Sequence, residues 1–238
     1  DSIEFEQSTL ESLRYFIVGG EVMPIPLIET WTKKGIPIRQ GFGLTEVGPN
    51  IASLHQDDSI RKIGSIGTFN FYVEAKLMSL DGKKSNHGEE GELWLKGPMV
   101  SPGYWRNEEA TQMAFEDGWF KTGDVLTCDE EGYYYVTDRI KNMFISGGEN
   151  VYPAEVEKYL LELAGIKEVA VIGVPDEKWG ETGKAYIVRK YLTLTKQDII
   201  EFASRGLAKF KIPKHFEFVN DLPKNSSGKI DRLKLRNG

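Results

Sequence analysis

The chain has 238 residues and a formal net charge of −6, and 40% of its residues are hydrophobic. These values fit a soluble globular protein of one or two domains and argue against general nucleic-acid binding. No apolar run approaches the roughly 18 residues of a membrane span, the start does not resemble a signal peptide, and the lone Cys128 excludes an internal disulfide. We therefore expect a cytoplasmic protein with no membrane span.

The charge is unevenly distributed along the chain. Residues 205–238 contain nine Lys and Arg against three Asp and Glu, so this end is basic. Such a segment indicates either a solvated face or contact with an anionic ligand such as a nucleotide. The sequence begins at Asp1 without Met, which we interpret as a fragment or a processed product.

The first 68 residues show the order of strands and helices that is typical of a parallel α/β layer. A short apolar run ends at Gly19-Gly20, and Pro24 and Pro26 are placed to open a helix. A strand, a helix and a second strand are expected at residues 13–18, 27–34 and 36–38. Strand, helix and strand in this order predict part of an α/β subdomain.

Alternation of apolar and polar residues replaces this order between residues 69 and 138. Asp81-Gly82 and residues 129–132 are hairpin signals, and Asn107 is placed to cap a short helix that ends at Ala114. Strands are expected at residues 72–79, 92–96, 125–128 and 133–137. The pattern predicts an antiparallel sheet or β-barrel subdomain.

The last part of the chain, residues 139–238, has the pattern of a small α+β domain. Pro153 starts an amphipathic helix that ends by Gly165, and Thr195 with Asp198 forms the capping box of a second helix. Strands are expected at residues 168–174, 184–189 and 215–219, followed by a polar loop at residues 223–229. The predicted fold is thus α/β and β, followed by a small mobile α+β C-terminal domain.

The motif at residues 40–46 has glycines on both sides of Phe42. Such glycines let the backbone approach a flat ligand on which the ring stacks. Thr45 would supply a hydroxyl group, and Glu46 a hard oxygen ligand suited to Mg²⁺. A tight turn after a strand explains the same residues about equally well.

Two further motifs carry charge beside glycine. Asp124 follows Gly123, and a carboxylate held by a glycine turn can accept two hydrogen bonds from a ribose diol, although a surface turn is the commoner interpretation. Lys229 follows Gly228 but precedes Ile230, so it is not the lysine of a Walker loop. It is either a cation on a flexible loop that can reach a developing negative charge or an ordinary exposed lysine.

Gly147 and Gly148 come shortly before the helix that starts at Pro153. Glycines permit positive φ angles and close backbone contact with a ligand. A plain loop-to-helix turn would use the same residues.

Taken together and in order, these motifs resemble the acyl-CoA synthetases of the adenylate-forming superfamily. The matching pieces cover nearly the whole chain: residues 19–21, 40–46, 103–105, 121–124, 138–157, 174–176 and 223–232. The resemblance implies that a carboxylic acid, expected to be a fatty or related acid, attacks the α-phosphate of ATP to form an acyl-adenylate and pyrophosphate. The thiol of coenzyme A then releases AMP. A carrier-protein-loading adenylation domain, a luciferase-like oxygenase and a non-catalytic binding module remain alternatives, and a homo-oligomer is left open.

The resemblance also implies a role for individual residues. The nucleotide contacts would be Gly20, Glu21, Gly41, Phe42, Asp124 and Arg139. Thr45 would contact phosphate, Glu46 would bind Mg²⁺, and Lys229 would bind the acid and the α-phosphate region. Lys141 matches a hinge, and Gly147-Gly148 would face the pantetheine arm of coenzyme A.

The chain departs from the family in two respects. The family usually has Tyr where Phe42 stands, so stacking is kept but a hydroxyl contact is lost. The family's phosphate loop and N-terminal subdomain lie upstream of the residues present here. We therefore expect a C-terminal portion that does not carry out adenylation by itself.

Overall fold

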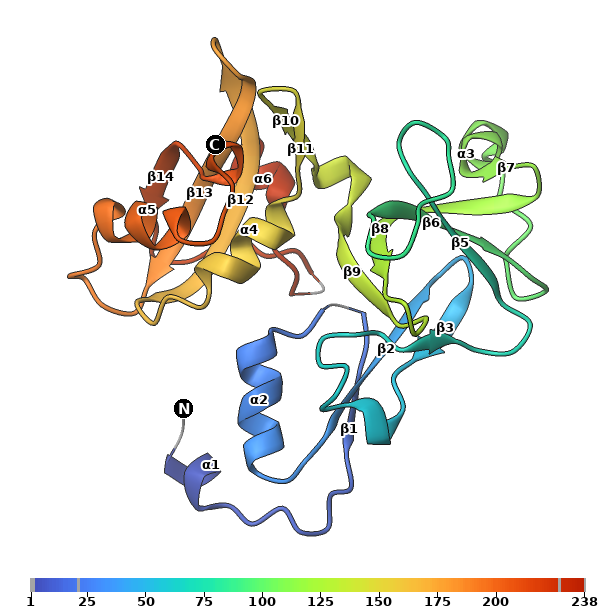
Figure 1. Ribbon diagram of the computed structural model, residues 1–238, viewed down its shortest axis with the longest axis horizontal. Helices are drawn as coiled ribbons and strands as arrows, with labels where there is room; N and C mark the ends of the chain where they lie inside the picture. The colour runs from blue at the N-terminus through green and yellow to red at the C-terminus, as the bar shows by residue number, and fades with distance from the viewer. Residues whose placement is uncertain (1–2, 21, 227, 238) are drawn as a thin grey trace. The chain divides into compact units, whose positions relative to one another are not determined.

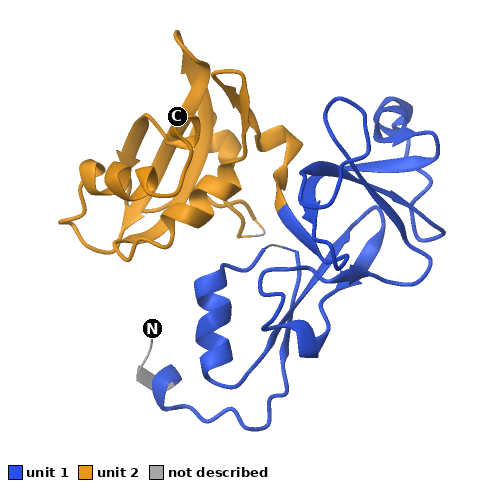
Figure 2. Cartoon of the chain, in the orientation of Figure 1, with its two compact units in different colours: residues 1–136 blue, residues 137–238 orange. Residues whose placement is uncertain are grey.

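The computed structural model describes residues 3–20, 22–226 and 228–237 (Figure 1). The chain divides into two compact units, residues 1–136 and 137–238, and each unit has its own hydrophobic core (Figure 2). Among the described residues, no helix is both long enough and apolar enough to cross a membrane.

The first sheet of unit 1 contains the predicted parallel layer. After a short helix α1 (Ile3–Gln7), strands β1 (Phe16–Val18) and β2 (Ile38–Leu44) run parallel and are connected by helix α2 (Ile25–Lys33). Strands β3 (Gly48–Ser53) and β4 (Thr68–Phe69) add to the sheet in antiparallel orientation. Because β2 runs on to Leu44, residues 40–44 of the motif lie in a strand, and a turn follows at residues 45–47.

The second sheet of unit 1 has the strand order β5-β6-β8-β7, and β9 pairs with β8. Its strands are β5 (Glu74–Met78), β6 (Gly91–Lys96), β7 (Phe115–Glu116), β8 (Trp119–Cys128) and β9 (Tyr134–Arg139). The Asn107 side chain accepts a hydrogen bond from the Ala110 N–H at 3.0 Å, which confirms the predicted cap of helix α3 (Glu108–Ala114). The Asp81-Gly82 signal forms a tight turn, but the strand that pairs with β5 begins only at Gly91.

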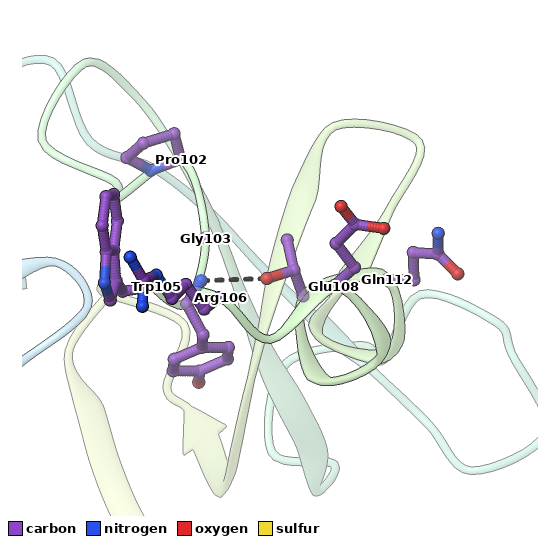
Figure 3. Close-up of a pocket in the computed structure, with 8 residues that line it drawn as sticks. Pro102, Gly103, Trp105, Arg106, Glu108 and Gln112 are labelled. Carbon is purple, nitrogen blue, oxygen red and sulfur yellow. Dashed lines mark hydrogen bonds between the residues drawn. The ribbon is translucent and has the colours of Figure 1, made fainter.

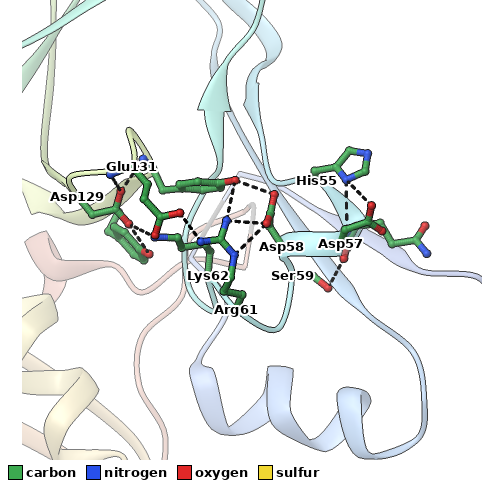
Figure 4. A network of polar contacts seen from close by, with 11 residues as sticks. His55, Asp57, Asp58, Ser59, Arg61, Lys62, Asp129 and Glu131 are labelled. Atoms are coloured by element: carbon green, nitrogen blue, oxygen red, sulfur yellow. Dashed lines mark hydrogen bonds and ion pairs between the residues drawn. The ribbon is translucent and has the colours of Figure 1, made fainter.

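The two sheets of unit 1 share one core, in which Val47 of the β2–β3 turn and Leu93 of β6 are both fully buried. A polar cluster joins the same two parts at the surface, near the short helix η1 (Gln56–Asp58) (Figure 4). Its centre is Lys62, whose Nζ lies 2.6 Å from Asp129 Oδ2 and 2.5 Å from Glu131 Oε1. Apolar packing and these ion pairs therefore act on the same junction.

Unit 2 is a sheet covered on both faces. The sheet has the order β11-β10-β13-β12, and β14 runs parallel to β13. Its strands are β10 (Phe144–Ser146), β11 (Glu149–Val151), β12 (Ile166–Asp176), β13 (Gly180–Arg189) and β14 (His215–Phe218). Val169 and Val171 of β12 pack into one core, and Ala170 and Ile172 into another, because successive side chains point to opposite faces.

Helices complete the two cores of unit 2. They are α4 (Pro153–Leu160), α5 (Lys196–Ser204), α6 (Arg232–Asn237) and the short η3 (Lys209–Lys211), whereas the short η2 (Ile140–Asn142) contributes no residue to either core among the described residues. The predicted capping box of Thr195 and Asp198 is confirmed at the start of α5. The helix expected to continue toward Gly165 ends at Leu160, and the sequence interpretation missed both the β10–β11 hairpin and α6.

Candidate active site

The edge of the parallel strands brings together several residues expected at the nucleotide. Val18 of β1 pairs with Gln40 of β2, so the segments that follow the two strands leave the sheet at the same edge. A Cβ atom added to Gly19 would lie 3.4 Å from the carbonyl oxygen of Gly41. This edge, at the carboxyl ends of parallel strands, is where α/β sheets commonly bind ligands.

Buried Gln40 fastens the loop that follows β1. Its Oε1 accepts a hydrogen bond from the Met23 N–H at 3.0 Å, and its Nε2 donates to the Ser65 carbonyl at 3.3 Å. Within this loop Gly20 has a φ of 87°, a conformation that favours glycine. Glu21, the other residue predicted here, lies outside the described residues.

Phe42 has a structural role that the sequence did not reveal. Its ring is only partly exposed and packs against the hydrophobic core of unit 1, and the residue pairs with Ala52 of β3. The neighbouring Gly41 is buried, and a Cβ atom there would collide with the Asn50 side chain. This strand therefore has little freedom to shift, which would present a ligand with a fixed surface.

Thr45 and Glu46 lie in the turn between β2 and β3, where Thr45 is exposed and Glu46 is partly buried. The Tyr104 hydroxyl donates a hydrogen bond to Glu46 Oε1 at 2.8 Å. The Ser101 N–H donates to the Glu46 carbonyl oxygen at 2.7 Å. Tyr104 thus orients this carboxylate from a distant loop. Residues 103–105 belong to the matching pieces of the family resemblance, but nothing in the sequence indicated a contact with Glu46.

The loop that contains Tyr104 also borders an open pocket of about 460 Å³ (Figure 3). The Tyr104 N–H donates to Thr111 Oγ1 of helix α3 at 2.9 Å, which ties the loop to the helix. Trp105 lies on the opposite wall from Glu108 and is 88% exposed. The pocket is shallow and open to solvent, so its lining alone indicates no particular ligand.

The donor set around Glu46 fits a magnesium ion that is bound together with a nucleotide. Among the described residues, no group of three or more His, Cys, Asp and Glu side chains could hold a metal by itself. Mg²⁺ is commonly bound by one or two carboxylates, with phosphates and water completing its shell. A single oriented carboxylate at Glu46 meets that requirement.

Asp124 lies in a β-bulge of strand β8, so the glycine turn expected from the sequence is wrong. Glu92 of β6 pairs with Val125, whereas Trp94 already pairs with Lys121. Extra residues are therefore accommodated around Gly123, whose φ is 71° and whose N–H donates to Glu92 Oε1 at 3.0 Å. The bulge carries the Asp124 side chain, which is only 5% exposed.

Asp138 organises the segment that contains the predicted hinge. Its Oδ1 accepts hydrogen bonds from the Arg139 N–H at 2.7 Å and from Asn142 Nδ2 at 2.8 Å. Its Oδ2 accepts one from the Ala154 N–H at 2.7 Å. Lys141 lies between these anchors, in η2, and is exposed.

The sequence contained one signal for this role of Asp138. Helix α4 begins after Tyr152, which makes no side-chain cap hydrogen bond. Helix starts need acceptors for their free N–H groups, so a missing cap residue calls for an acceptor from elsewhere. Asp138 supplies it.

Gly147 and Gly148 form the two-residue turn of the β10–β11 hairpin, where Ser146 pairs with Glu149. Their φ angles are 63° and 89°, as a tight hairpin turn of this kind requires. The Gly147 N–H donates to the Trp179 carbonyl at 2.9 Å, and a Cβ atom at Gly147 would lie 2.5 Å from the Trp179 ring. The loop-to-helix interpretation is therefore wrong.

Lys229 lies at the end of a short hairpin rather than in an open loop. The Asn225 N–H donates to the Lys229 carbonyl at 2.8 Å, and the Lys229 N–H donates to Asn225 Oδ1 at 3.0 Å. Gly228 has a φ of 82°, and Lys224 pairs with Ile230. The Lys229 side chain is exposed at this tip.

Family models match both units. The model of the AMP-binding enzymes matches residues 2–105, and the model of the AMP-binding enzyme C-terminal domain matches residues 155–229. The chain therefore belongs to the AMP-binding enzyme family, as the order of its motifs predicted.

Curated relatives are CoA ligases by name. The chain is 43% identical over 233 residues to the long-chain-fatty-acid–CoA ligase FadD13 of Mycobacterium tuberculosis, covering 98% of this chain and 46% of that protein. It is 43% identical over 224 residues to the 2-succinylbenzoate–CoA ligase of Bacillus licheniformis, covering 94% of this chain and 46% of that protein. The chain thus spans about half the length of the curated relatives it matches.

A solved structure confirms the predicted fold class. It is the o-succinylbenzoate CoA synthetase MenE of Bacillus subtilis in complex with the acyl-adenylate intermediate OSB-AMP. The TM-score is 0.89 at 38% identity, over 98% of this chain and 48% of that one.

Proposed function

We propose that this chain is part of an ATP-dependent acid–CoA ligase that acts through an acyl-adenylate. The observation that carries the proposal is the exposed Lys229 at a hairpin tip, in a chain 43% identical to a CoA ligase over nearly its whole length. The MenE structures in complex with AMP, and with ATP and magnesium, support nucleotide and Mg²⁺ as ligands here. Coenzyme A is named as the substrate of several relatives, which supports it as the acceptor.

In the first half-reaction, a carboxylate oxygen forms a bond to the α-phosphorus of ATP, and the bond to pyrophosphate breaks. Mg²⁺ supplies positive charge on the phosphates when it is bound. Glu46 would provide its one protein carboxylate, held by Tyr104, and Thr45 would donate its hydroxyl to phosphate. The Lys229 ammonium would offset the repulsion between the two anions and the negative charge that develops in the transition state.

The nucleoside would be held mainly by unit 1. Gly20 and Gly41 allow close backbone approach at the strand edge, beside the Phe42 ring. Asp124 would accept hydrogen bonds from the ribose hydroxyls, and Arg139 would also contact the nucleotide. These roles follow from the family resemblance, and substitution of each of these residues would test them.

In the second half-reaction, the thiol sulfur of coenzyme A forms a bond to the acyl carbonyl carbon, and the bond to AMP breaks. Gly147 and Gly148 present backbone without side chains, which suits passage of the pantetheine arm. Lys141 would serve as the hinge about which unit 2 turns between the two half-reactions. We propose a fatty or related acid as the substrate, because one relative is named for long-chain fatty acids.

The test supplies a panel of carboxylic acids with ATP, Mg²⁺ and coenzyme A to the native-length protein that carries this chain. Acid-dependent AMP release and acyl-CoA formation are expected. Lys229→Ala should lower adenylate formation by ~10²–10³-fold, the usual cost of removing one transition-state contact. Lys83→Ala, which removes a lysine outside this hairpin whose side chain is 82% exposed, is the control and should stay active.

Two outcomes would count against the proposal, and a third would contradict a separate expectation about the chain alone. Binding of AMP without turnover of any acid would indicate a non-catalytic module. Acyl transfer to a carrier protein but not to coenzyme A would indicate a carrier-loading enzyme. We also expect the 238-residue chain alone to give no acid-dependent ATP–pyrophosphate exchange, and robust exchange by it would contradict that expectation.

A further inference from the structure

Helix α6 begins immediately after the hairpin that carries Lys229. Its first residue, Arg232, forms a two-pronged ion pair with Glu157 of α4: Nη1 lies 2.6 Å from Oε1, and Nη2 lies 2.8 Å from Oε2. The same Nη1 donates to the Val171 carbonyl of β12 at 2.9 Å. The Val171 N–H in turn donates to Glu157 Oε1 at 2.6 Å. One guanidinium group therefore joins α4, β12 and α6.

This ion pair lies in a protected position. Glu157 is 8% exposed, and its neighbours on α4, Val156 and Leu160, are fully buried. A buried ion pair contributes little net stability compared with apolar residues of similar size, because both charges lose their hydration. What it can contribute is a specific geometry.

The bidentate pair fixes the direction of the first turn of α6. A planar guanidinium that makes two parallel hydrogen bonds to one carboxylate permits only a narrow range of orientations. The other end of α6 is held separately, since the Tyr186 hydroxyl donates to the Leu235 carbonyl at 3.0 Å and Leu235 is buried. With both ends held, α6 has a defined position on unit 2.

The hairpin is coupled to α6 through its backbone. Only Ile230 and Asp231 separate Lys229 from Arg232. Ile230 pairs with Lys224, and the Asp231 N–H donates to the Pro223 carbonyl at 2.8 Å. A displacement of Arg232 would therefore move the base of the hairpin and, with it, Lys229.

We propose that Glu157 and Arg232 are positioning residues that place the Lys229 ammonium for the adenylation half-reaction. The proposal rests on the function proposed above, in which Lys229 acts in that half-reaction. It assigns to these two side chains no contact with substrate. They act through the backbone of residues 229–231.

The first test measures amide hydrogen exchange in the 238-residue chain without any ligand. Glu157→Gln keeps an acceptor for the Val171 N–H but removes the negative charge. Arg232→Lys keeps the positive charge but removes the planar guanidinium that makes two hydrogen bonds to Glu157. In both variants, the amides of Asn225, Gly228, Lys229 and Asp231 should exchange at least ~5-fold faster, because local opening becomes easier. Arg205→Lys is the matched control, since it alters an ion pair with Glu201 whose side chains are 66% and 63% exposed.

The second test separates the two half-reactions in the native-length protein. The variants should slow acid-dependent ATP–pyrophosphate exchange by ~10-fold or more, the scale expected for a misplaced catalytic group. Transfer of the acyl group from supplied acyl-adenylate to coenzyme A should stay within about twofold, because Lys229 does not act in that step. A general loss of folded protein would lower both rates by the same factor.

The outcomes distinguish the two proposals. Unchanged exchange at the hairpin amides in both variants, or an equal loss in both half-reactions, would overturn the positioning role. If the unaltered protein forms no adenylate from any acid, the proposed function and the catalytic part of this inference fail together. The hydrogen-exchange result still decides in that case whether the pair orders the hairpin.

Discussion

The Oδ2 atom of Asp138 accepts a hydrogen bond from the backbone N–H of Ala154 at 2.7 Å, between residues 16 positions apart in the chain. The other carboxylate oxygen binds Arg139 and Asn142. One buried side chain thus caps helix α4 and holds the segment around Lys141 against it. Asp138 precedes Lys141, whereas Asn142 and Ala154 follow it, so a rotation about Lys141 would break or rearrange these hydrogen bonds.

Replacing Asp138 by Ala should destabilise unit 2. The change leaves the partly buried N–H groups of Arg139 and Ala154 without their acceptor, at a cost of about 2 kcal/mol in the free energy of unfolding. Urea unfolding followed by circular dichroism measures this loss. Asp57→Ala is the control, since its side chain is 83% exposed and its removal should leave the midpoint unchanged. Equal effects of the two substitutions would show that the Asp138 contacts add no stability.

Replacing Lys62 by Met should weaken the junction between the two sheets of unit 1. The substitution keeps the apolar length of a side chain that is 8% exposed but removes its ion pairs with Asp129 and Glu131. A lower urea midpoint is expected. Lys83→Met is the matched control, because Lys83 and Asp81 are 82% and 57% exposed and solvent screens their attraction. If the urea midpoint fell only for Lys83→Met, the Lys62 ion pairs would not stabilise the junction between the two sheets.

The polar cluster around Lys62 should make the free energy of unfolding depend on pH. Hydrogen bonds from Lys62, then from Arg61, lower the pKa of Glu131 below its ordinary value of 4.5. Hydrogen bonds from Tyr133, then from Arg61, lower the pKa of Asp58 below 3.8. The folded state therefore binds fewer protons than the unfolded state in this range, so stability is present above the ordinary values and is lost as pH falls through the lowered ones.

Urea midpoints measured between about pH 5.5 and pH 3 should show this loss, since ordinary carboxyl groups titrate there. In Lys62→Met the decline should be shallower, because Glu131 loses the largest cause of its lowered pKa. An identical decline in the two proteins would mean that the cluster does not contribute to acid sensitivity.

Gly147→Ala and Gly148→Ala form a matched pair of substitutions in one turn. Both residues have positive φ, so each change should cost about 1–2 kcal/mol of backbone strain. The new Cβ at Gly147 would meet the Trp179 ring at 2.5 Å, whereas a Cβ at Gly148 would have no atom of the described residues within 4 Å, apart from those of its own chain neighbours. Gly147→Ala should therefore lower stability more in urea unfolding and slow acyl transfer to coenzyme A more. A larger effect at Gly148 would argue against the Trp179 contact.

Tyr104→Phe tests the support of the proposed metal ligand. Loss of the hydroxyl removes the 2.8 Å hydrogen bond that orients Glu46, and loss of such a supporting contact typically weakens metal affinity by ~10–100-fold. The Mg²⁺ concentration needed for half-maximal adenylation in the native-length protein should rise accordingly, while the rate at saturating Mg²⁺ changes less. Tyr72→Phe is the control, because Tyr72 is 85% exposed. An unchanged Mg²⁺ requirement would mean that Glu46 does not need this donor.

Several features could be predicted because they depend on neighbouring residues. The Asn107 cap, the Thr195 and Asp198 capping box and the parallel pair β1–β2 each follow from a local pattern of a few residues. The Gly123 bulge and the Gly147-Gly148 hairpin were not predicted, although all three glycines had been singled out. A glycine in the sequence indicates that the backbone can adopt a positive φ angle. Which local structure forms there, whether a turn, a bulge or a hairpin, depends on how the neighbouring strand pairs.

The sequence by itself determined the family, through the order of its motifs, and the residue types available for chemistry. Only the tertiary structure decided how those residues are held. Tyr104 reaches Glu46 across 58 positions of the chain, and Arg232 reaches Glu157 across 75. The physical reason is that such contacts depend on which strands and helices pack together, and that choice is made by the whole core rather than by any local pattern.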